Sequence, residues 1–395
     1  MKKKITVGTS LIITLLAVLL TFQLTYSFVG MEYQAKVDTL TKTKTDFSLL
    51  AEADGLVREN FLGKMDDEKT KEGTIRGYVE ELEDDYSVYL TAEEYTRYQK
   101  ENAPSGNGIG VRLTYDAQTN RVIVYNVIAP SPAQEKGILK GDILTKIDDK
   151  DVSELGFYDT LSALSVQEGT KIKLTVKREI ATQVLEMSFD LTVGKVTPSS
   201  LDYEIIGDVG YVQIFSFDEG FKKQFDSALA VLTKSSVKGI IFDVRNTAGG
   251  DAASAIHALD KLLPEGEIVH SLDQKGKKKT IKSDENFIDL PFAVLVNKNT
   301  AFAAEIFAAC MKDYDIDLVG ETTYGKSLEQ KAVPLSNGSA LLLSCKSYTP
   351  PISPSFENVG VEPDIVCELG AQNLYLLEHE ADIQLQEAFR AVMNY

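Results

Sequence analysis

The sequence predicts a multidomain α/β protein, and three observations along the chain support this. Apolar residues at helical spacing come first, a β-rich stretch with closely spaced turn residues follows, and strands then alternate with helices. The length of 395 residues also exceeds that of one ordinary domain. We therefore divide the chain at residues 1–30, 31–100, 104–180, 181–370 and 371–395.

The segment 1–30 is predicted to be a cytoplasmic lysine tail followed by a transmembrane helix. Lys2, Lys3 and Lys4 precede residues 5–31, which carry no charge, and about 20 apolar residues are enough to span a bilayer. Lysines on the N-terminal side keep that end in the cytoplasm. We expect a single-pass cell-membrane protein with extracytoplasmic C-terminal domains. The alternative is secretion after signal cleavage, although no clean small-residue cleavage site follows the apolar core.

The segment 31–100 is predicted to be a polar tether followed by helices. Leu50, Ala53, Val57 and Phe61 are spaced so that they share one helical face, and the pattern recurs near residue 80. Residues 46–83 therefore indicate a helical pair. Thr91 is suited to cap a further short helix.

Residues 104–180 are predicted to form a small, mostly β domain, because the short β-rich runs 122–127 and 171–177 are separated by turn residues. Beyond this domain, strands are expected at 210–214, 239–244, 292–296 and 317–320. Helices are expected at 220–233, 251–263 and 301–313, which gives an α/β layered domain. The amphipathic stretch 371–393 is predicted to be a C-terminal helix.

Composition excludes several classes of function. A formal net charge of −18 makes the protein a poor general binder of nucleic acid, whose phosphates would repel it. The chain has three cysteines, which cannot form a disulfide framework and lack zinc-site spacing. The three histidines are scattered, so we expect neither a metal centre nor a cofactor.

Several motifs occur in the order found in one protein family. The glycine-containing run Gly108-Ile109-Gly110-Val111, followed by Ser-Pro-Ala and Gly-Asp-Ile-Leu segments, resembles a PDZ domain. The loop 243–250, which ends in Gly249-Gly250, and the run 320–330, which contains Lys326 and Gln330, are similar to those of the carboxy-terminal processing proteases. The resemblance extends from about residue 46 to the C-terminus.

This resemblance implies a crotonase-like α/β protease core and a PDZ domain that binds protein C-termini. A glycine-rich loop can offer backbone N–H groups to a terminal carboxylate while the strand edge pairs with the peptide. The expected partners are therefore C-terminal peptides, bound through Gly108, Ile109, Gly110 and Val111. The family also suggests a homo-oligomer, or an active family relative, as a partner.

The resemblance further implies a serine nucleophile activated by a lysine. Lysine is a base only when it is neutral, so burial must lower its pKa. Lys326 matches the family base and Gln330 the residue that orients it, here on one face of a helical turn. Gly249 and Gly250 match the oxyanion loop, and the second donor is the N–H after the nucleophile, at Ala303.

The nucleophile position departs from the family pattern. The serine slot, three residues before Glu305, contains Phe302. Thr300 is a possible substitute, although two positions differ by about 200° around a helix, so it should face away. Ser327 follows the lysine directly and lies on the same segment. Phe302 is also compatible with a simple core position in an apolar helix.

We therefore predict a catalytically impaired family member that acts through its PDZ domain. The first alternative is an active serine-type endopeptidase with another nucleophile, most plausibly Thr300. The second alternative is a structural surface protein without a ligand. Retained catalytic roles for Lys326 and Gln330 compete with the possibility that they are inherited structure.

Overall fold

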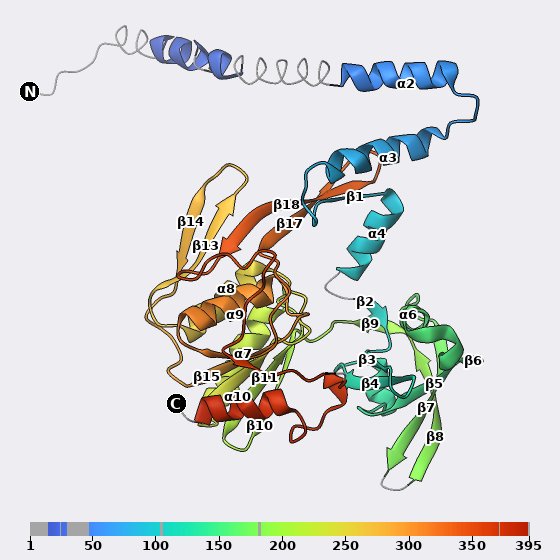
Figure 1. Ribbon diagram of the computed structural model, residues 1–395, viewed down its shortest axis with the longest axis vertical. Coiled ribbons are helices and arrows are strands. Elements are labelled where there is room, and N and C mark those ends of the chain that lie inside the picture. Colours follow the sequence, from blue (N-terminus) through green and yellow to red (C-terminus); the bar gives the residue numbers. More distant parts are fainter. Residues whose placement is uncertain are drawn as a thin grey trace, which may run out of the picture. The chain divides into compact units, whose positions relative to one another are not determined.

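The computed structural model describes residues 15–23, 25–29, 47–102, 106–180, 183–370 and 372–393 (Figure 1). Its contacts divide the chain into two compact units, Met1–Ile75 and Arg76–Tyr395. Residues 15–23 and 25–29 of the predicted anchor are helical, and the rest of residues 1–30 lies outside the described residues. Among the residues that are described, no single helix combines the length and apolar character needed to cross a membrane.

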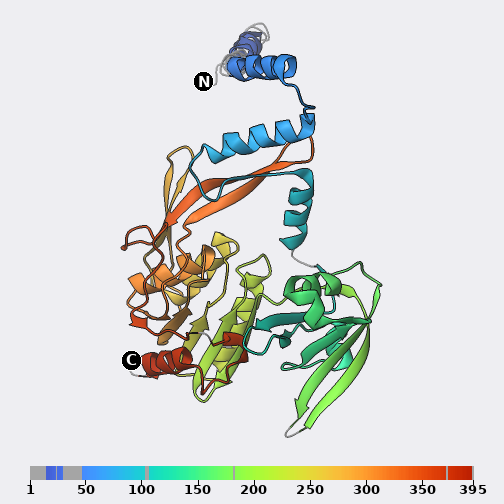
Figure 2. The same ribbon diagram turned by 45° about the vertical axis from the view of Figure 1, so that its right-hand side comes forward.

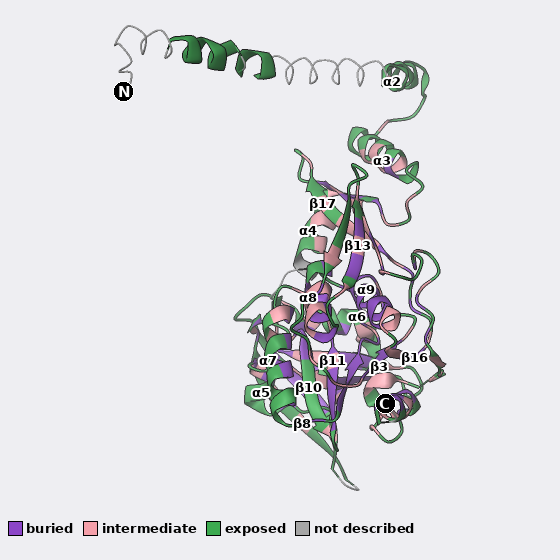
Figure 3. Cartoon of the chain, turned by 90° about the vertical axis from the view of Figure 1, so that its left-hand side faces the viewer, coloured by how far each residue is buried: buried purple, intermediate pink, exposed green. Residues whose placement is uncertain are grey.

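The first unit contains the predicted helical pair. The helices are α2 (Ser48–Asn60) and α3 (Asp67–Glu80), the second of which continues into the other unit. Arg58 at the end of α2 pairs with Asp54 and with Asp67 at the start of α3, each at 2.8 Å. No residue of α2 is buried, and all of its residues except the intermediate Asp54 are exposed (Figure 3). Such exposed ion pairs contribute little to stability.

In the second unit, the end of α3 is followed by a short strand and by the helix that Thr91 was expected to cap. These elements are β1 (Val88–Leu90) and α4 (Ala92–Glu101). The N–H of Glu94 donates to the Thr91 hydroxyl at 3.2 Å, and the N–H of Thr91 donates to the Glu94 carboxylate at 2.8 Å. This reciprocal pair is a capping box, which confirms Thr91 as the cap.

The predicted β domain is a twisted antiparallel sheet flanked by two helices, at the right of Figure 1. Its sheet has the order β3-β4-β5-β7-β8, with β6 paired to β5, and β2 pairs separately with β9. The strands are β2 (Gly106–Gly108), β3 (Val111–Asp116), β4 (Arg121–Val127), β5 (Ile143–Ile147), β6 (Lys150–Asp151), β7 (Lys171–Ile180), β8 (Gln183–Thr192) and β9 (Gly194–Val196). The helices are α5 (Pro132–Lys136) and α6 (Val152–Leu164).

The α/β domain is built on a six-stranded sheet in which all pairs except β10–β11 are parallel. Its order is β10-β11-β12-β15-β16-β19. The strands are β10 (Leu201–Ile206), β11 (Val209–Ile214), β12 (Gly239–Asp243), β15 (Phe292–Val296), β16 (Asp317–Gly320) and β19 (Ile365–Val366). The helices are α7 (Phe221–Lys234), α8 (Ala252–Leu262), α9 (Ala303–Asp313) and α10 (Ile383–Met393), with a 3₁₀ turn η1 (Leu374–Leu376).

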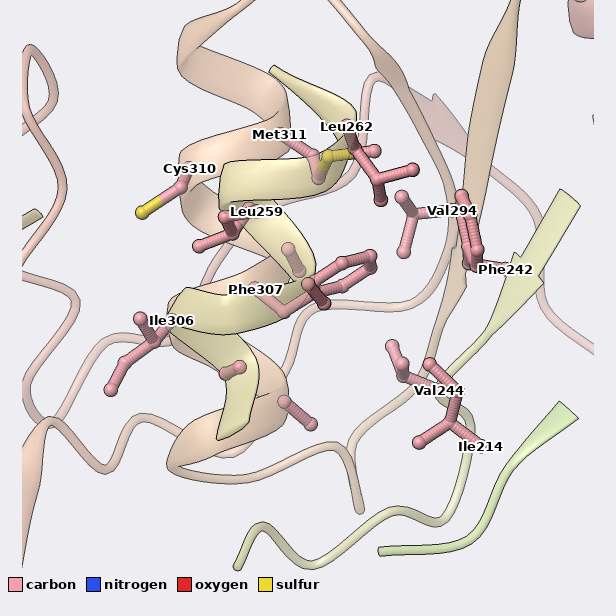
Figure 4. Packing of buried hydrophobic residues seen from close by; sticks show 14 of the residues in the cluster. Ile214, Phe242, Val244, Leu259, Leu262, Val294, Ile306, Phe307, Cys310 and Met311 are labelled. Carbon is pink, nitrogen blue, oxygen red and sulfur yellow. The ribbon is translucent and has the colours of Figure 1, made fainter. Parts of the chain in front are cut away.

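Both faces of this sheet are covered, because successive side chains of a strand point to opposite faces. Ile240 and Phe242 pack with α7, α8 and α9, whereas Ile241 between them packs against α10. Figure 4 shows Phe307 of α9 directed at Phe242 and Val294 of the sheet. Figure 3 shows the same helix among buried residues. The helix that contains the predicted catalytic segment is therefore fixed by the main core.

A second sheet was missed by the sequence reasoning. It has the order β1-β18-β13-β14 with β17 on β18, and its long strands are clearest in Figure 2. The strands beyond β1 are β13 (Glu267–Asp273), β14 (Lys278–Lys282), β17 (Leu328–Pro334) and β18 (Ala340–Thr349). They mix polar and apolar residues without the clean alternation of a half-buried strand.

The predicted C-terminal helix over 371–393 is wrong in its first half. Residues 374–376 form only the η1 turn, and α10 begins at Ile383. The carboxylate of Asp382 accepts the N–H of Leu385 at 3.1 Å and so caps α10 at this point. Residues 372–382 are therefore not part of this helix.

Candidate active site

Lys326 and Gln330 are brought together as predicted, but not on a helix. Lys326 lies in the loop before β17, and Gln330 lies in β17 at a bulge that follows Glu329. The ammonium group of Lys326 donates to the side-chain oxygen of Gln330. The helical turn expected for this pair is therefore wrong, and the bulge brings the two side chains together instead.

Tyr86, from a distant part of the chain, contacts both Lys326 and Gln330. Its carbonyl oxygen accepts the side-chain amide of Gln330 at 2.5 Å, and its hydroxyl donates to the carbonyl of Gly325 at 3.3 Å. Its ring lies 4.8 Å from the Lys326 ammonium, within the range of a cation–π contact. Burial raises the pKa of Tyr86 to about 12, so its hydroxyl stays protonated and can donate.

The half-buried Lys326 has the electrostatic character expected of a base. Burial lowers its pKa below the ordinary lysine value, because the ammonium form loses solvation. The carboxylates of Glu357, Asp84 and Glu305 oppose this shift, but their effect is smaller. The neutral amine is therefore more accessible than in an exposed lysine.

Glu305 fastens the lysine loop to the start of α9. One carboxylate oxygen accepts the N–H groups of Phe302 at 2.9 Å and Lys326 at 2.8 Å. The other accepts the N–H of Gly325 at 2.6 Å and the hydroxyl of Thr323 at 2.5 Å. Burial raises the pKa of Glu305, while these four donors act in the opposite direction. A single buried side chain thus sets the position of residue 302 relative to Lys326.

Phe302 occupies a sharp backbone elbow immediately before α9. Its φ of 48° and ψ of −106° lie in a region that a bulky residue rarely adopts. The side chain is 8% exposed, and its ring meets that of Tyr348 edge-on at 6.1 Å between centroids. The prediction of Phe302 as an ordinary helical core residue is therefore only half right: it is buried, but it precedes the helix.

The glycine loop lies against this elbow. A Cβ atom on Gly249 would lie 3.1 Å from the Cβ of Phe302 and 3.4 Å from the nitrogen of Ala303. Gly250 approaches the backbone of Phe217 so closely that a Cβ would lie 2.7 Å from it. Within the part of the chain that the structure describes, the N–H groups of Gly249 and Ala303 donate to no protein acceptor. The predicted oxyanion residues are thus adjacent to one another.

Arg245 holds the strand end that leads into this loop. Its guanidinium donates to the Asp243 carboxylate at 2.6 Å, the Asp382 carboxylate at 3.1 Å and the Gln384 side-chain oxygen at 2.9 Å. Arg245 and Asp243 are almost completely buried. This network links the glycine loop to the start of α10.

Neither substitute hydroxyl is directed toward Lys326 by any described contact. The fully buried Thr300 hydroxyl donates to the carbonyl of Val244 at 2.9 Å and accepts the N–H of Asn297 at 3.0 Å. Ser327 is 1% exposed, and its N–H donates to the Glu357 carboxylate at 2.5 Å. Thr300 therefore has a structural role in the turn before the elbow.

The predicted peptide-binding residues line a separate groove in the β domain. Gly108, Ile109, Gly110 and Val111 face Leu164 of α6 across a cavity of about 190 Å³. No described contact uses the N–H of Ile109 or Gly110, so both can serve an incoming acceptor. Gly110 is required because its φ is +85° and a Cβ would overlap the Ser131 side chain.

Comparison with known proteins matches each of these regions. Residues 208–367 match peptidase family S41, residues 107–188 match the PDZ domain, and residues 18–94 match the N-terminal domain of the activating protease CtpB. The chain thus contains matches to the S41 peptidase, PDZ and CtpB N-terminal models in one order, and it is similar to relatives named carboxy-terminal processing protease. The predicted family and its PDZ domain are thereby confirmed.

Relatives in the family align with most of the chain. Carboxy-terminal processing protease CtpA of Bacillus subtilis (strain 168) is 29% identical over 329 residues, covering 82% of this chain and 69% of the relative. The chloroplastic C-terminal processing peptidase of Tetradesmus obliquus is 28% identical, covering 78% of this chain and 71% of the relative.

Solved structures of the family share the fold. The photosystem II D1 C-terminal processing protease has a TM-score of 0.50 and 26% identity, covering 79% of this chain and 86% of that one. A putative S41 protease from Bacteroides fragilis NCTC 9343 has a TM-score of 0.61 and 16% identity, covering 85% of this chain and 92% of that one. The second likeness concerns the fold alone.

Three residues of this family site escaped the sequence reasoning. Tyr86 and Tyr348 come from segments that are distant in the sequence from the residues they contact. The role of Glu305 in holding the lysine loop becomes visible only when its four hydrogen-bond donors are known. Glu305 was used only to locate the nucleophile slot, although an acid in an otherwise apolar helix was a further signal for a role of its own. Across the described residues, no group of three or more His, Cys, Asp and Glu side chains is arranged to hold a metal ion.

Proposed function

We propose that this chain is a membrane-anchored, extracytoplasmic family member that does not use the serine–lysine route and binds protein C-termini in its PDZ groove. The observation that carries the proposal is Phe302 at the elbow, with its backbone N–H on Glu305 and its ring packed on Tyr348. A phenyl ring supplies neither a nucleophilic atom nor a proton for a lysine to remove.

The surroundings of Lys326 support loss of the nucleophile with retention of the scaffold. Thr300, the best-placed substitute, is engaged with two backbone groups. Lys326 and Gln330 remain in contact, so the base and its orienting residue persist. The proposal interprets this pair as a remnant of the dyad.

Peptide binding is supported by the groove at Gly108–Val111 and by the free N–H groups beside it. Such main-chain donors do not depend on side-chain identity, so they survive sequence drift. The anchor rests on the three N-terminal lysines and the uncharged residues 5–31. A homo-oligomer or an active relative as partner is part of the proposal.

The second candidate is an active serine-type peptidase, which the retained contact between Lys326 and Gln330 favours. Cleavage of unfolded casein by the full chain separates the two candidates. We expect no cleavage by the wild type and no labelling by a fluorophosphonate probe. Wild-type cleavage that disappears in Lys326→Ala would refute the impaired state.

Phe302→Ser is the complementary variant. The elbow lies against Gly249, and the Glu305 carboxylate ties it to the Lys326 loop, so we expect the new serine to gain probe labelling that Lys326→Ala then removes. For binding, the full chain is titrated with a random C-terminal peptide library and with its C-terminally amidated form. Binding that the amide abolishes supports the PDZ function, whereas no binding favours a structural surface protein.

A further inference from the structure

We propose that Asn373 limits the length of peptide with which the PDZ groove pairs, by occupying the free edge of β3 at Tyr115. This inference rests on the proposed peptide-binding function. It assigns a specificity role to the C-terminal segment, which lies far from the groove loop in the sequence.

The strand β3 offers an open edge to a peptide. It is the first strand of its sheet, and within the described residues β4 is its sole strand partner. A carboxylate held at Gly110 would lie at the N-terminal end of β3, so the peptide would run antiparallel to the strand. The edge groups of β3 therefore determine how many peptide residues are paired.

The direction of these edge groups follows from the pairing of β4. Val124 uses both of its backbone groups on the side away from β3: its N–H donates to Asp142 at 2.9 Å, and its carbonyl accepts the N–H of Gly141 at 2.8 Å. Leu113 lies opposite Val124, so the backbone groups of Leu113 face the open edge. Alternation places those of Tyr115 on the same edge.

Asn373 already uses the edge position at Tyr115. Its side-chain amide donates to the carbonyl of Tyr115 at 3.1 Å and to the hydroxyl of Thr114 at 3.0 Å. The acceptor that a longer peptide would need is thus engaged by the protein itself. Leu113, one edge position earlier, has no such contact among the described residues.

The segment that carries Asn373 is fixed in place. The side-chain oxygen of Asn373 accepts the N–H of Tyr375 at 3.2 Å and so caps η1. The ring of Tyr375 stacks on that of Tyr125 in β4, with 4.0 Å between centroids. Asn373 is therefore held against β3 by two contacts that do not involve the groove.

The consequence is a limit on peptide register. Because edge positions alternate every second residue, a peptide pairs through roughly its last four residues before it reaches Tyr115. Residues further upstream meet an acceptor that is already satisfied. Affinity should therefore stop rising beyond about four residues.

Asn373→Asp is the decisive variant. The aspartate retains an oxygen that can cap Tyr375, but it cannot donate to the carbonyl of Tyr115. Gln372→Glu, at the exposed neighbouring side chain, introduces the same charge and serves as the matched control. Asn373→Ser is a second variant, whose hydroxyl can cap Tyr375 but is too short to reach the edge.

The probes are C-terminal hexapeptides that bind the full-length wild type, each shortened stepwise from its N-terminus. Wild type and Gln372→Glu should bind hexamers and tetramers within about twofold. Asn373→Asp and Asn373→Ser should bind hexamers about fivefold more tightly than tetramers, the ratio for one net hydrogen bond.

Two results overturn the inference, and they differ in meaning. The same length dependence in all four proteins refutes the role of Asn373 while leaving peptide binding intact. Absence of binding by any peptide, or binding that survives C-terminal amidation, refutes the groove function itself and the inference with it.

Discussion

Replacing Glu305 by glutamine should loosen the link between the elbow and the lysine loop. The carboxylate accepts four hydrogen bonds, from the backbone of Phe302, Gly325 and Lys326 and from the hydroxyl of Thr323. An amide of the same shape can accept on one side only. Its NH₂ group must face two of the four donors.

The cost can be worked out from these partners. In the better orientation the NH₂ group faces Thr323, whose hydroxyl rotates to accept, and the N–H of Gly325 loses its partner at about 1–3 kcal/mol. The two bonds on the other oxygen lose their charge assistance, at about 1 kcal/mol each. The total is roughly 3–5 kcal/mol, which is large for a change of one atom.

Amide hydrogen exchange of the full chain at pH 8 measures this loss locally. The protection of Gly325 and Lys326 should fall by the corresponding free energy, because Glu305 accepts both of their N–H groups. Glu362→Gln, at an exposed side chain of the same domain, is the matched control and should change protection little. A loss below about 1 kcal/mol in Glu305→Gln would mean that other contacts hold the loop, and the reasoning would be wrong.

Two further predictions concern the charged groups around the site. Because burial lowers the pKa of Lys326, its neutral fraction should rise at lower pH than for an ordinary lysine with a pKa of about 10.4. Acylation of Lys326, followed by mass spectrometry at a series of pH values, should show this lowered midpoint. Gln330→Glu adds an adjacent anion and should move the midpoint to higher pH. An unshifted midpoint in the wild type contradicts the burial argument. Arg245→Met leaves the Asp243 and Asp382 carboxylates without their shared cation, so urea unfolding should show a loss of about 3–5 kcal/mol; a loss under about 1 kcal/mol would show that the two carboxylates find other partners.

The fold class was predictable because its signals are local. Periodicity and turn residues lie within one element, so the helices α7, α8 and α9 and the strands β11, β12, β15 and β16 were placed to within a few residues, whereas β10 and β19 of the same sheet were not predicted. The start of α9 was misplaced at residue 301 because Phe302 adopts a positive φ, which the apolar run around it does not reveal. Its conformation depends on the Glu305 carboxylate and on the adjacent Gly249.

The site was predictable only where motif spacing encodes it. The pairing of Lys326 with Gln330 followed from a family pattern, yet the supporting structure is a bulged strand rather than a helix. Tyr86 and Gln330 are 244 positions apart in the sequence, and Asn373 and Tyr115 are 258 positions apart. No local pattern therefore predicts either contact. Such pairs are decided by tertiary packing.

The contact between Tyr86 and Gln330 has a consequence for what counts as a self-sufficient unit. The segment that matches peptidase family S41 spans residues 208–367, but the carbonyl that orients Gln330 belongs to residue 86. A shortened chain that starts at the PDZ domain would lack β1, the strand that pairs with β18, and would leave the glutamine amide without its acceptor. The contact between Lys326 and Gln330 can therefore be inherited intact only when the N-terminal segment with Tyr86 is inherited together with the protease domain. Recombination between relatives at the PDZ boundary would separate that segment from the protease domain.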